Sequence, residues 1–433
     1  MNDLHGLFGF IDASPTAFHA VENLRAMLVN AGCEPLEERA AWRLEPGKDY
    51  CLTRNQSSII AFRVPESGFA PFRIAASHSD SPCFKLKPES LRRGDGYATL
   101  NVEKYGGMLM STWLDRPLGI AGRVIVARGD GLEARLVNLD GAPALIPNLP
   151  IHVNRDANDG VALNAQVDML PVVAAEGGET SLLDRIAGAA GAEAGEIVGA
   201  DLYLCNRDRA SVWGLNGEFI AAPRLDDLEC AYASARAFIG AKPSRHIDVL
   251  AVFDNEEVGS GTRQGADSTL LAEVLRRIAL ALGAGPQELE ASLAGSFMAS
   301  ADNAHAVHPN HPEKYDAGNR VRMNGGVVVK FNAAQKYASD ALSAAVFEAV
   351  CRRAGVPTQR FANRSDIPGG STLGNIAVRR ASMPAVDIGL AQLAMHSALE
   401  SAGAADLGHM IGALRAFHEA EIDVERDGLI RLR

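Results

Sequence analysis

Two adjacent glutamates, Glu256 and Glu257, follow a strongly apolar run of the sequence, residues 247–253. A short run rich in β-branched and aliphatic residues that breaks at a polar loop predicts a buried strand, which places the next side chains at its carboxyl end. Two carboxylates are the minimum for metal-assisted hydrolysis, because one must stay ionised on a cation while its neighbour transfers protons. Alternatively, the two glutamates are solvated charges in a surface loop. Residues elsewhere in the sequence are needed to choose between these two interpretations.

An imidazole and a carboxylate follow a second predicted strand, residues 72–76. His78 and Asp80 are two residues apart on an extended segment, so their side chains face the same side. Asp80 can then hold one ring nitrogen of His78 while the other nitrogen meets a cation, and this pairing fixes the tautomer.

Further candidate ligands lie at the ends of other predicted elements. Asp226 opens a helical pattern, where the positive end of the helix dipole favours its ionised form. The complete candidate set is His78, Asp226, Glu257, Asp302 and His396, with Glu256 beside it. These nitrogen and oxygen donors suit zinc, or cobalt and manganese by substitution. Two divalent cations would balance three carboxylates and one hydroxide, whereas a single cation would leave excess negative charge.

The elements that must position these residues follow an α/β pattern. Strands are predicted at 58–64, 296–301, 327–331 and 385–389, and helices at 268–282, 340–353 and 404–420, the second capped by Ser339. An earlier helix is predicted from Ser14-Pro15 to about Gly32, with Phe18, Val21, Leu24 and Leu28 on its inner face. The polar residues thus fall at strand carboxyl ends, where open α/β sheets place their sites.

The length of 433 residues predicts two domains. From about residue 94 the pattern changes to short alternating runs, including a hairpin around Asp130-Gly131, and from about residue 222 the α/β pattern resumes. We therefore expect a catalytic domain made of residues 1–93 and 222–433, with a β-rich domain, residues 94–221, inserted into it.

Composition narrows the functional classes. The net charge of −11, with 53 acidic against 42 basic residues, argues against a nucleic-acid or anionic-membrane surface. The six cysteines have no paired spacing, which favours reduced structural thiols. Neither a signal peptide nor a membrane-spanning run of about 20 apolar residues is present, so a cytoplasmic location is expected.

Several segments of the sequence resemble one known family, the M18 metalloaminopeptidases of the aspartyl aminopeptidase type. The resemblance covers nearly the whole chain and rests on residues 10–15 with 18–21, 77–83, 223–226, 254–260, 300–310 and 392–397. Two departures are Asp227, where the family often has asparagine, and Gly369, where some relatives have cysteine. The first adds a negative charge beside Asp226 and bears on metal preference.

The resemblance implies a phosphorylase/hydrolase-like α/β fold with a mixed sheet flanked by helices, and a dinuclear zinc exopeptidase. His78, Glu257, Asp302 and His396 would hold two zinc ions bridged by Asp226, Asp80 would orient His78, and Glu256 would be the general base. Peptides with a free amino terminus would be the substrates. The inserted domain would serve oligomerisation into a dodecamer, with His152 reaching the site of a neighbouring subunit.

Substrate preference is predicted from one lysine. Relatives that prefer amino-terminal aspartate or glutamate need a cation near that side chain, and Lys330, on an otherwise apolar strand, matches this position, with His305 assisting. Alternatively, Lys330 pairs with an acid of the protein itself. Other functions left open are an aminopeptidase that prefers neutral residues, a deacylase on the same scaffold, and a non-catalytic assembly protein.

Overall fold

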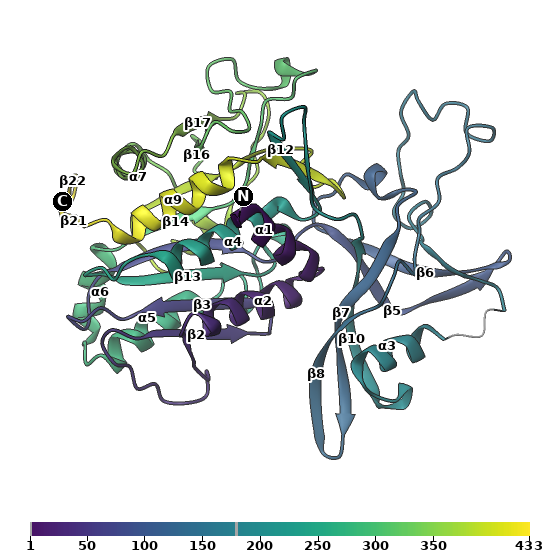
Figure 1. The fold of residues 1–433 in the computed structure, drawn as a ribbon, viewed down its shortest axis with the longest axis horizontal. Helices are drawn as coiled ribbons and strands as arrows, with labels where there is room; N and C mark the ends of the chain where they lie inside the picture. The colour runs from purple at the N-terminus through teal and green to yellow at the C-terminus, as the bar shows by residue number, and fades with distance from the viewer. Residues whose placement is uncertain (1, 178–180) are drawn as a thin grey trace.

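The computed structural model describes residues 2–177 and 181–433. Figure 1 shows two bodies side by side: a main body, in which helices cover both faces of a large central sheet, and a second body built on a separate sheet. The predicted α/β fold with a mixed sheet is confirmed.

The central sheet is mixed and has nine strands in the order β1-β2-β3-β13-β4-β14-β18-β16-β17. Its four middle strands, β13, β4, β14 and β18, are all parallel to one another. Their carboxyl ends therefore meet at one edge of the sheet. The strands are β1 (Glu34–Pro35), β2 (Asp49–Arg54), β3 (Ser58–Arg63), β13 (Ile247–Phe253), β4 (Phe72–His78), β14 (Phe297–Ala301), β18 (Ala385–Gly389), β16 (Val327–Phe331) and β17 (Thr358–Ala362).

Two hydrophobic cores, one on each face, hold this sheet between helices. Every residue of β4 and β13 is buried, as expected for middle strands covered on both faces. One face packs against α1 (Asn2–Ala13), α2 (Ala17–Asn30), α4 (Leu225–Gly240), α7 (Ala341–Arg353) and α9 (Asp406–Glu419). The other packs against α5 (Leu270–Ala281), α6 (Pro286–Ala294) and α8 (Leu373–Ala377).

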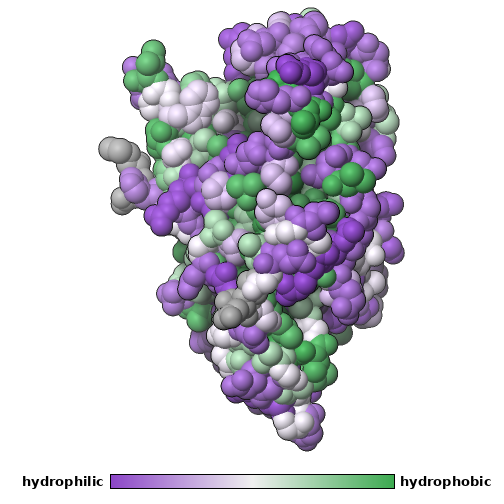
Figure 2. All heavy atoms as spheres, turned by 90° about the vertical axis from the view of Figure 1, so that its right-hand side faces the viewer, coloured by the Kyte–Doolittle hydropathy of each residue, from purple (hydrophilic) through white to green (hydrophobic). Residues whose placement is uncertain are grey.

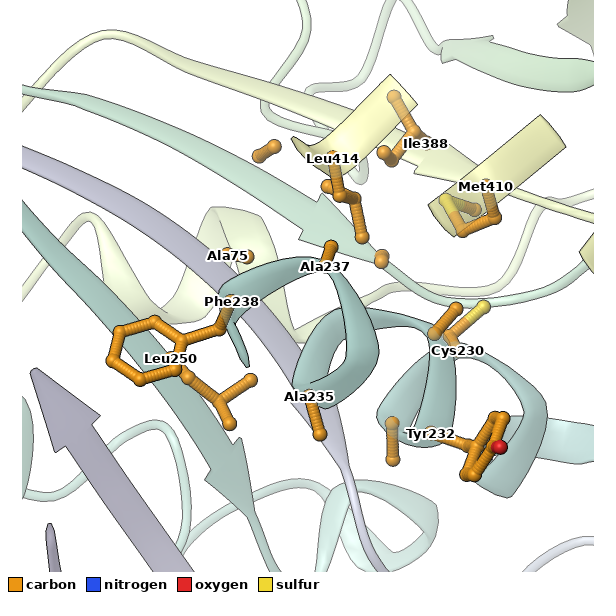
Figure 3. Close-up of a cluster of buried hydrophobic side chains, with 14 of the residues drawn as sticks. Ala75, Cys230, Tyr232, Ala235, Ala237, Phe238, Leu250, Ile388, Met410 and Leu414 are labelled. Carbon is orange, nitrogen blue, oxygen red and sulfur yellow. The ribbon is translucent and has the colours of Figure 1, made fainter. Parts of the chain in front are cut away.

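Side chains of α4 fill the space between the sheet and α9. In Figure 3, Phe238 lies beside Leu250 of β13, and Leu414 of α9 lies above Ala237. Phe238 is fully buried, which stabilises the fold by roughly 2–3 kcal/mol relative to an exposed ring. The helix that carries the predicted ligand Asp226 in its first turn is thus packed against the sheet.

The second body is a six-stranded antiparallel sheet in the order β8-β7-β10-β5-β6-β9, with one helix against it. Its strand β5 begins at Cys83, upstream of residue 94, and the hairpin predicted around Asp130 is present as β7 and β8. The elements are β5 (Cys83–Gly94), β6 (Tyr97–Tyr105), β7 (Leu118–Arg128), β8 (Gly131–Asn138), β9 (Val172–Ala175), α3 (Leu182–Ala190) and β10 (Ile197–Asn206).

A smaller five-stranded sheet, in the order β11-β12-β20-β19-β15, lies next to the site. Its strands are β11 (Ser211–Trp213), β12 (Phe219–Ala222), β15 (Ala304–His305), β19 (Ala391–Leu393) and β20 (Glu400–Gly403). The chain ends in a hairpin of β21 (Ile422–Arg426) and β22 (Leu429–Leu432), which Ile422 anchors in the core. Across the described residues, no helix has the length and apolar character needed to cross a membrane.

Two predicted helix starts are wrong by a few residues. Helix α2 begins at Ala17 after Thr16, not at Pro15, and the separate helix α1 precedes it. Helix α7 is capped by Asp340, whose Oδ1 accepts a hydrogen bond from the Ser343 amide at 2.7 Å. Ser339, the predicted cap, instead accepts a hydrogen bond from the amide of Asp387 on β18. The Ser339 hydroxyl, which the local sequence predicts as a helix cap, therefore forms a tertiary hydrogen bond instead.

Candidate metal centre

The parallel strands bring the predicted ligands to the same edge of the central sheet. Strand β4 ends at His78 and β14 ends just before Asp302, while β13 pairs Phe253 with His78 and then leads into the loop of Glu256 and Glu257. Asp226 reaches the same place from the amino end of α4. Residues far apart in the sequence thus meet because strand ends meet.

His78 is almost completely buried and has carboxylates at both ring nitrogens. Its Nδ1 lies 3.3 Å from Asp80 Oδ1 and 3.1 Å from the Asp80 carbonyl oxygen, and its Nε2 lies 3.6 Å from Asp226 Oδ1. Its backbone amide donates to Asp227 Oδ2 at 3.0 Å. This is the predicted arrangement, in which Asp80 holds one nitrogen and the other faces the site.

Three groups of candidate ligand atoms lie close together among the described residues, and two of them share Asp226. In the first donor group, ligand atoms of His78, Asp226, Asp227 and Asp302 all lie within 4.8 Å of one another. The second donor group has the same spacing and consists of Asp226, Glu257 and His396, with His396 Nε2 lying 3.4 Å from both Asp226 Oδ2 and Glu257 Oε2. Asp226 is common to these two groups, and a third group joins His78, Glu256 and Glu257.

The buried carboxylates in these groups lack enough partners from the protein. Asp226 Oδ1, Asp227 Oδ1 and Glu257 Oε1 have no hydrogen-bond partner among the described residues. Burial, reinforced by Asp226, raises the pKa of Glu257 well above its ordinary value. Buried, unpaired carboxylate oxygens are costly, and a divalent cation would both pair with them and favour their ionised form. The residues present therefore fit a bound cation.

Asp80 connects His78 to the glutamate loop and to the second body. Its Oδ1 and Oδ2 each accept a hydrogen bond at 3.2 Å, from the amides of Glu256 and Glu257 respectively. The hydroxyl of Tyr105, at the end of β6, donates to Asp80 Oδ2 at 2.6 Å and accepts from Asn255 Nδ2 at 2.8 Å. One carboxylate thus fixes the imidazole and the backbone of both glutamates.

Glu256 lies in a short 3-10 turn, Glu256–Val258, next to both donor groups. Asn255 enters this turn with φ 63°, a left-handed conformation that asparagine tolerates better than most residues. A carboxylate oxygen of Glu256 is within 4.8 Å of ligand atoms of His78 and Glu257. Burial raises the pKa of Glu256 to about 8, and a cation beside it would lower that value.

The other predicted site residues are placed differently. Lys330 is buried, with Nζ 3.6 Å from Asp302 Oδ1 and donating to the Asn303 carbonyl at 2.8 Å, so it pairs with an acid of the protein. His305 is exposed and packs near the ring of Phe361. His152 lies in an exposed turn of the second body, and neither histidine belongs to the donor groups found among the described residues.

Sequence reasoning missed three residues of the site. Asp227 was noted only as an extra charge, yet it belongs to the first donor group. Tyr105 and Glu400 hold the site through hydrogen bonds to Asp80 and to backbone amides. The adjacency of Asp227 to Asp226 was a usable signal, whereas nothing in the sequence around Tyr105 or Glu400 marks them.

A mixed α/β sheet with buried carboxylates and imidazoles beyond the carboxyl ends of its parallel strands defines a hydrolase-type fold with a candidate metal centre. The sequence matches the family described as Aminopeptidase I zinc metalloprotease (M18) over residues 10–418. The chain belongs to the M18 family and is an aminopeptidase hydrolase.

Individual relatives and solved structures that are similar to this chain belong to, or are named for, aminopeptidases of this kind. A "Probable M18 family aminopeptidase 2" of Clostridium acetobutylicum is 45% identical over 410 residues, which cover 92% of this chain and 94% of that protein. The cryo-EM structure of the Ape4 and Nbr1 complex contains a chain with TM-score 0.93 and 35% identity, covering 96% of this chain and 85% of that one. The S. cerevisiae mApe1 dodecamer has a subunit with TM-score 0.84 and 28% identity, covering 96% and 95%.

Proposed function

We propose that this protein is a two-zinc aminopeptidase that removes amino-terminal residues from peptides and prefers aspartate and glutamate. The observation that carries the two-cation part is the shared position of Asp226 in both donor groups. A carboxylate has two oxygens, so one aspartate can serve two cations at once.

The first and second donor groups support an assignment of the ligands. His78, Asp226 and Asp302 would hold one cation, and Asp226, Glu257 and His396 the other, with cobalt or manganese as possible substitutes for zinc. Zinc in such a site polarises a peptide carbonyl and lowers the pKa of a water molecule toward neutrality.

Within this scheme Glu256 moves the proton. Its carboxylate belongs to neither the first nor the second donor group, so in this ligand assignment it is free to take a proton from the attacking water and deliver it to the leaving amine. Asp80 keeps Glu256 in place through its amide and keeps the His78 ring oriented. The two neighbouring glutamates therefore have separate roles, with Glu257 as a ligand.

Aminopeptidase activity and its metal dependence can be tested together. Purified protein is assayed on aspartyl, glutamyl and leucyl peptides, before and after chelation and after zinc is restored. We expect turnover of peptides with a free amino terminus, its loss on chelation, its return with zinc, and the highest kcat/KM for aspartyl and glutamyl peptides. Amino-terminally acetylated peptides are the control. Turnover of acetylated peptides would indicate a deacylase or endopeptidase instead, and a preference for leucyl peptides would contradict the acidic specificity.

The acidic preference rests on Lys330. Burial lowers the pKa of Lys330, but Asp302 and other acids nearby raise it, and the net shift is upward, so the ammonium group stays charged inside the protein. Its Asp302 partner is also a proposed ligand, and a cation would draw on the negative charge of that carboxylate. Positive charge from Lys330 would then be available to an acidic substrate side chain, with His305 nearby.

Replacing Lys330 with methionine, which keeps most of the length of the side chain but removes the ammonium group, is expected to reduce the preference for aspartyl over leucyl peptides about tenfold or more. Removing one partner of a buried charge pair costs roughly 2–5 kcal/mol or more, and a factor of ten corresponds to about 1.4 kcal/mol. The ratio of the two kcat/KM values is the readout, since it cancels a general loss of activity. Zinc content is measured in parallel because Lys330 also touches Asp302. An unchanged ratio at full zinc content would refute the assignment.

We further infer that the protein assembles into a homo-oligomer through the second body, residues 94–221 in the predicted division. Figure 2, which views the molecule from the side of the second body, shows hydrophobic side chains among hydrophilic ones on that surface. Exposed apolar residues in one loop region are Leu145, Leu149, Ile151, Val153, Val161 and Val167. His152 lies among them, which supports a role in completing a neighbouring site, and the structurally similar mApe1 is a dodecamer.

A further inference from the structure

Glu400 connects two of the proposed ligands through their backbones. It is the first residue of β20 and is 1% exposed. Its Oε2 accepts a hydrogen bond from the Asp226 amide at 2.9 Å, and its Oε1 accepts one from the His396 amide at 2.6 Å. Each oxygen of one carboxylate is therefore used by a different ligand residue.

Both of these amides lie in backbone that regular secondary structure does not hold. His396 has φ 65°, in the left-handed region, and Asp226 has non-helical angles at the start of α4. A buried amide without a partner is costly, so each conformation depends on an acceptor placed by the tertiary fold. Glu400 is such an acceptor for both.

Glu400 is itself held firmly. Strand β20 pairs with β12, with Ala222 directly opposite Glu400, and β12 leads after two residues into the start of α4. Strand β20 also pairs with β19, which ends three residues before His396. The carboxylate therefore starts from a backbone that is fixed relative to both of the segments it joins.

We propose that Glu400 is a positioning residue that sets the distance between Asp226 and His396 and thereby the affinity of the second donor group for its cation. Two backbone hydrogen bonds, of 2.9 Å and 2.6 Å, to one buried carboxyl group fix the two ligand residues relative to one another. Across the second donor group, His396 Nε2 lies 3.4 Å from Asp226 Oδ2. This inference rests on the proposed two-zinc function.

The first donor group does not depend on Glu400 in the same way. His78 is the last residue of β4 and Asp302 follows the last residue of β14, and these two strands are paired in the middle of the central sheet. Removing a hydrogen bond from Glu400 should therefore affect the two cations unequally. That inequality separates a positioning role from a general effect on folding.

The test is Glu400→Gln in the full-length protein. The amide keeps the shape of the side chain, but its NH2 group faces a backbone N–H, so one of the two hydrogen bonds is lost. Zinc is titrated calorimetrically into chelator-stripped protein. We expect two binding events in the wild type. In the variant we expect a loss of roughly 10- to 100-fold in affinity at one of them, as for other residues behind metal ligands, and a smaller loss at the other, because Asp226 belongs to both donor groups. Turnover should fall at limiting zinc and recover at excess zinc.

Asp406→Asn provides a matched control. Asp406 is also buried and also accepts two backbone hydrogen bonds, from Asn324 at 2.5 Å and from Gly326 at 2.9 Å, but it is not part of either donor group. Its variant should lower the melting temperature and leave both zinc affinities unchanged. If Glu400→Gln does not fold, Glu400→Asp, which keeps the charge on a shorter side chain, takes its place with the same expected result.

The outcomes distinguish a failure of this proposal from a failure of the proposed two-zinc function on which it rests. If the wild-type protein binds fewer than two zinc ions, the two-zinc function itself is wrong. If the wild type binds two and the Glu400 variant binds two with unchanged affinities, or loses both equally, Glu400 does not position the second donor group.

Discussion

Replacing Glu256 with glutamine is expected to lower kcat by about 10²- to 10⁴-fold while zinc content stays at two per chain. The amide cannot accept a proton from water at neutral pH, and Glu256 belongs to neither the first nor the second donor group, so binding of the proposed cations should survive. The measurement is kcat on the best peptide of the substrate panel, with zinc content determined on the same sample. KM should change much less than kcat, because the effect falls on the transfer of protons.

Glu290→Gln is the control for this substitution. Glu290 is exposed on α6, so this variant makes the same chemical change away from the site. It should have wild-type turnover. Near wild-type turnover of the Glu256 variant at full zinc content would show that another group carries the proton. Loss of zinc from that variant would show instead that Glu256 is a ligand.

Replacing Asp226 with asparagine is expected to weaken both cations and abolish activity. Asp226 lies in both donor groups, so the loss of its charge and of one oxygen removes a ligand from each. The loss of affinity should exceed the roughly 10- to 100-fold expected for residues that only support ligands. Calorimetric titration of stripped protein with zinc, together with peptide turnover at saturating zinc, measures both effects.

Asp227→Asn is the matched control, one residue along the chain. Asp227 Oδ2 accepts the His78 amide at 3.0 Å, and asparagine can keep that hydrogen bond through its carbonyl oxygen. We expect this variant to keep two zinc ions, with a change confined to the first donor group. Two cations bound at wild-type affinity in the Asp226 variant would contradict the shared role of Asp226.

The sequence predicts the parts of this site that follow from strand ends. His78, Glu257 and Asp302 each come at or just after an apolar run that could be recognised as a buried strand, and parallel strands bring their carboxyl ends together. Asp226 and His396 have weaker local signals, and the family resemblance implied that Asp226 would bridge two ions. The distances between the ligand atoms of these residues could be obtained only from the three-dimensional structure.

The residues that hold the ligands were not predictable, because their contacts are to backbone amides or across sheets. Glu400 and Tyr105 lie in ordinary strand segments, and only the tertiary structure brings their oxygens to Asp226, His396 and Asp80. The predicted cap of α7, Ser339, was wrong for the same reason, because Ser339 has a tertiary hydrogen-bond partner that the local sequence does not reveal. Periodicity identifies elements, but it does not say which distant group a side chain will meet.

Tyr105 connects the second body to the candidate metal centre of the main body. Its hydroxyl lies at the end of β6, yet it holds Asp80 and Asn255 on either side of the glutamate loop. A minimal enzyme engineered by deleting the six-stranded sheet would leave the Asp80 carboxylate short of a donor and release the loop that carries Glu256. The two bodies should therefore be treated as one catalytic unit when the chain is shortened, grafted or split into fragments.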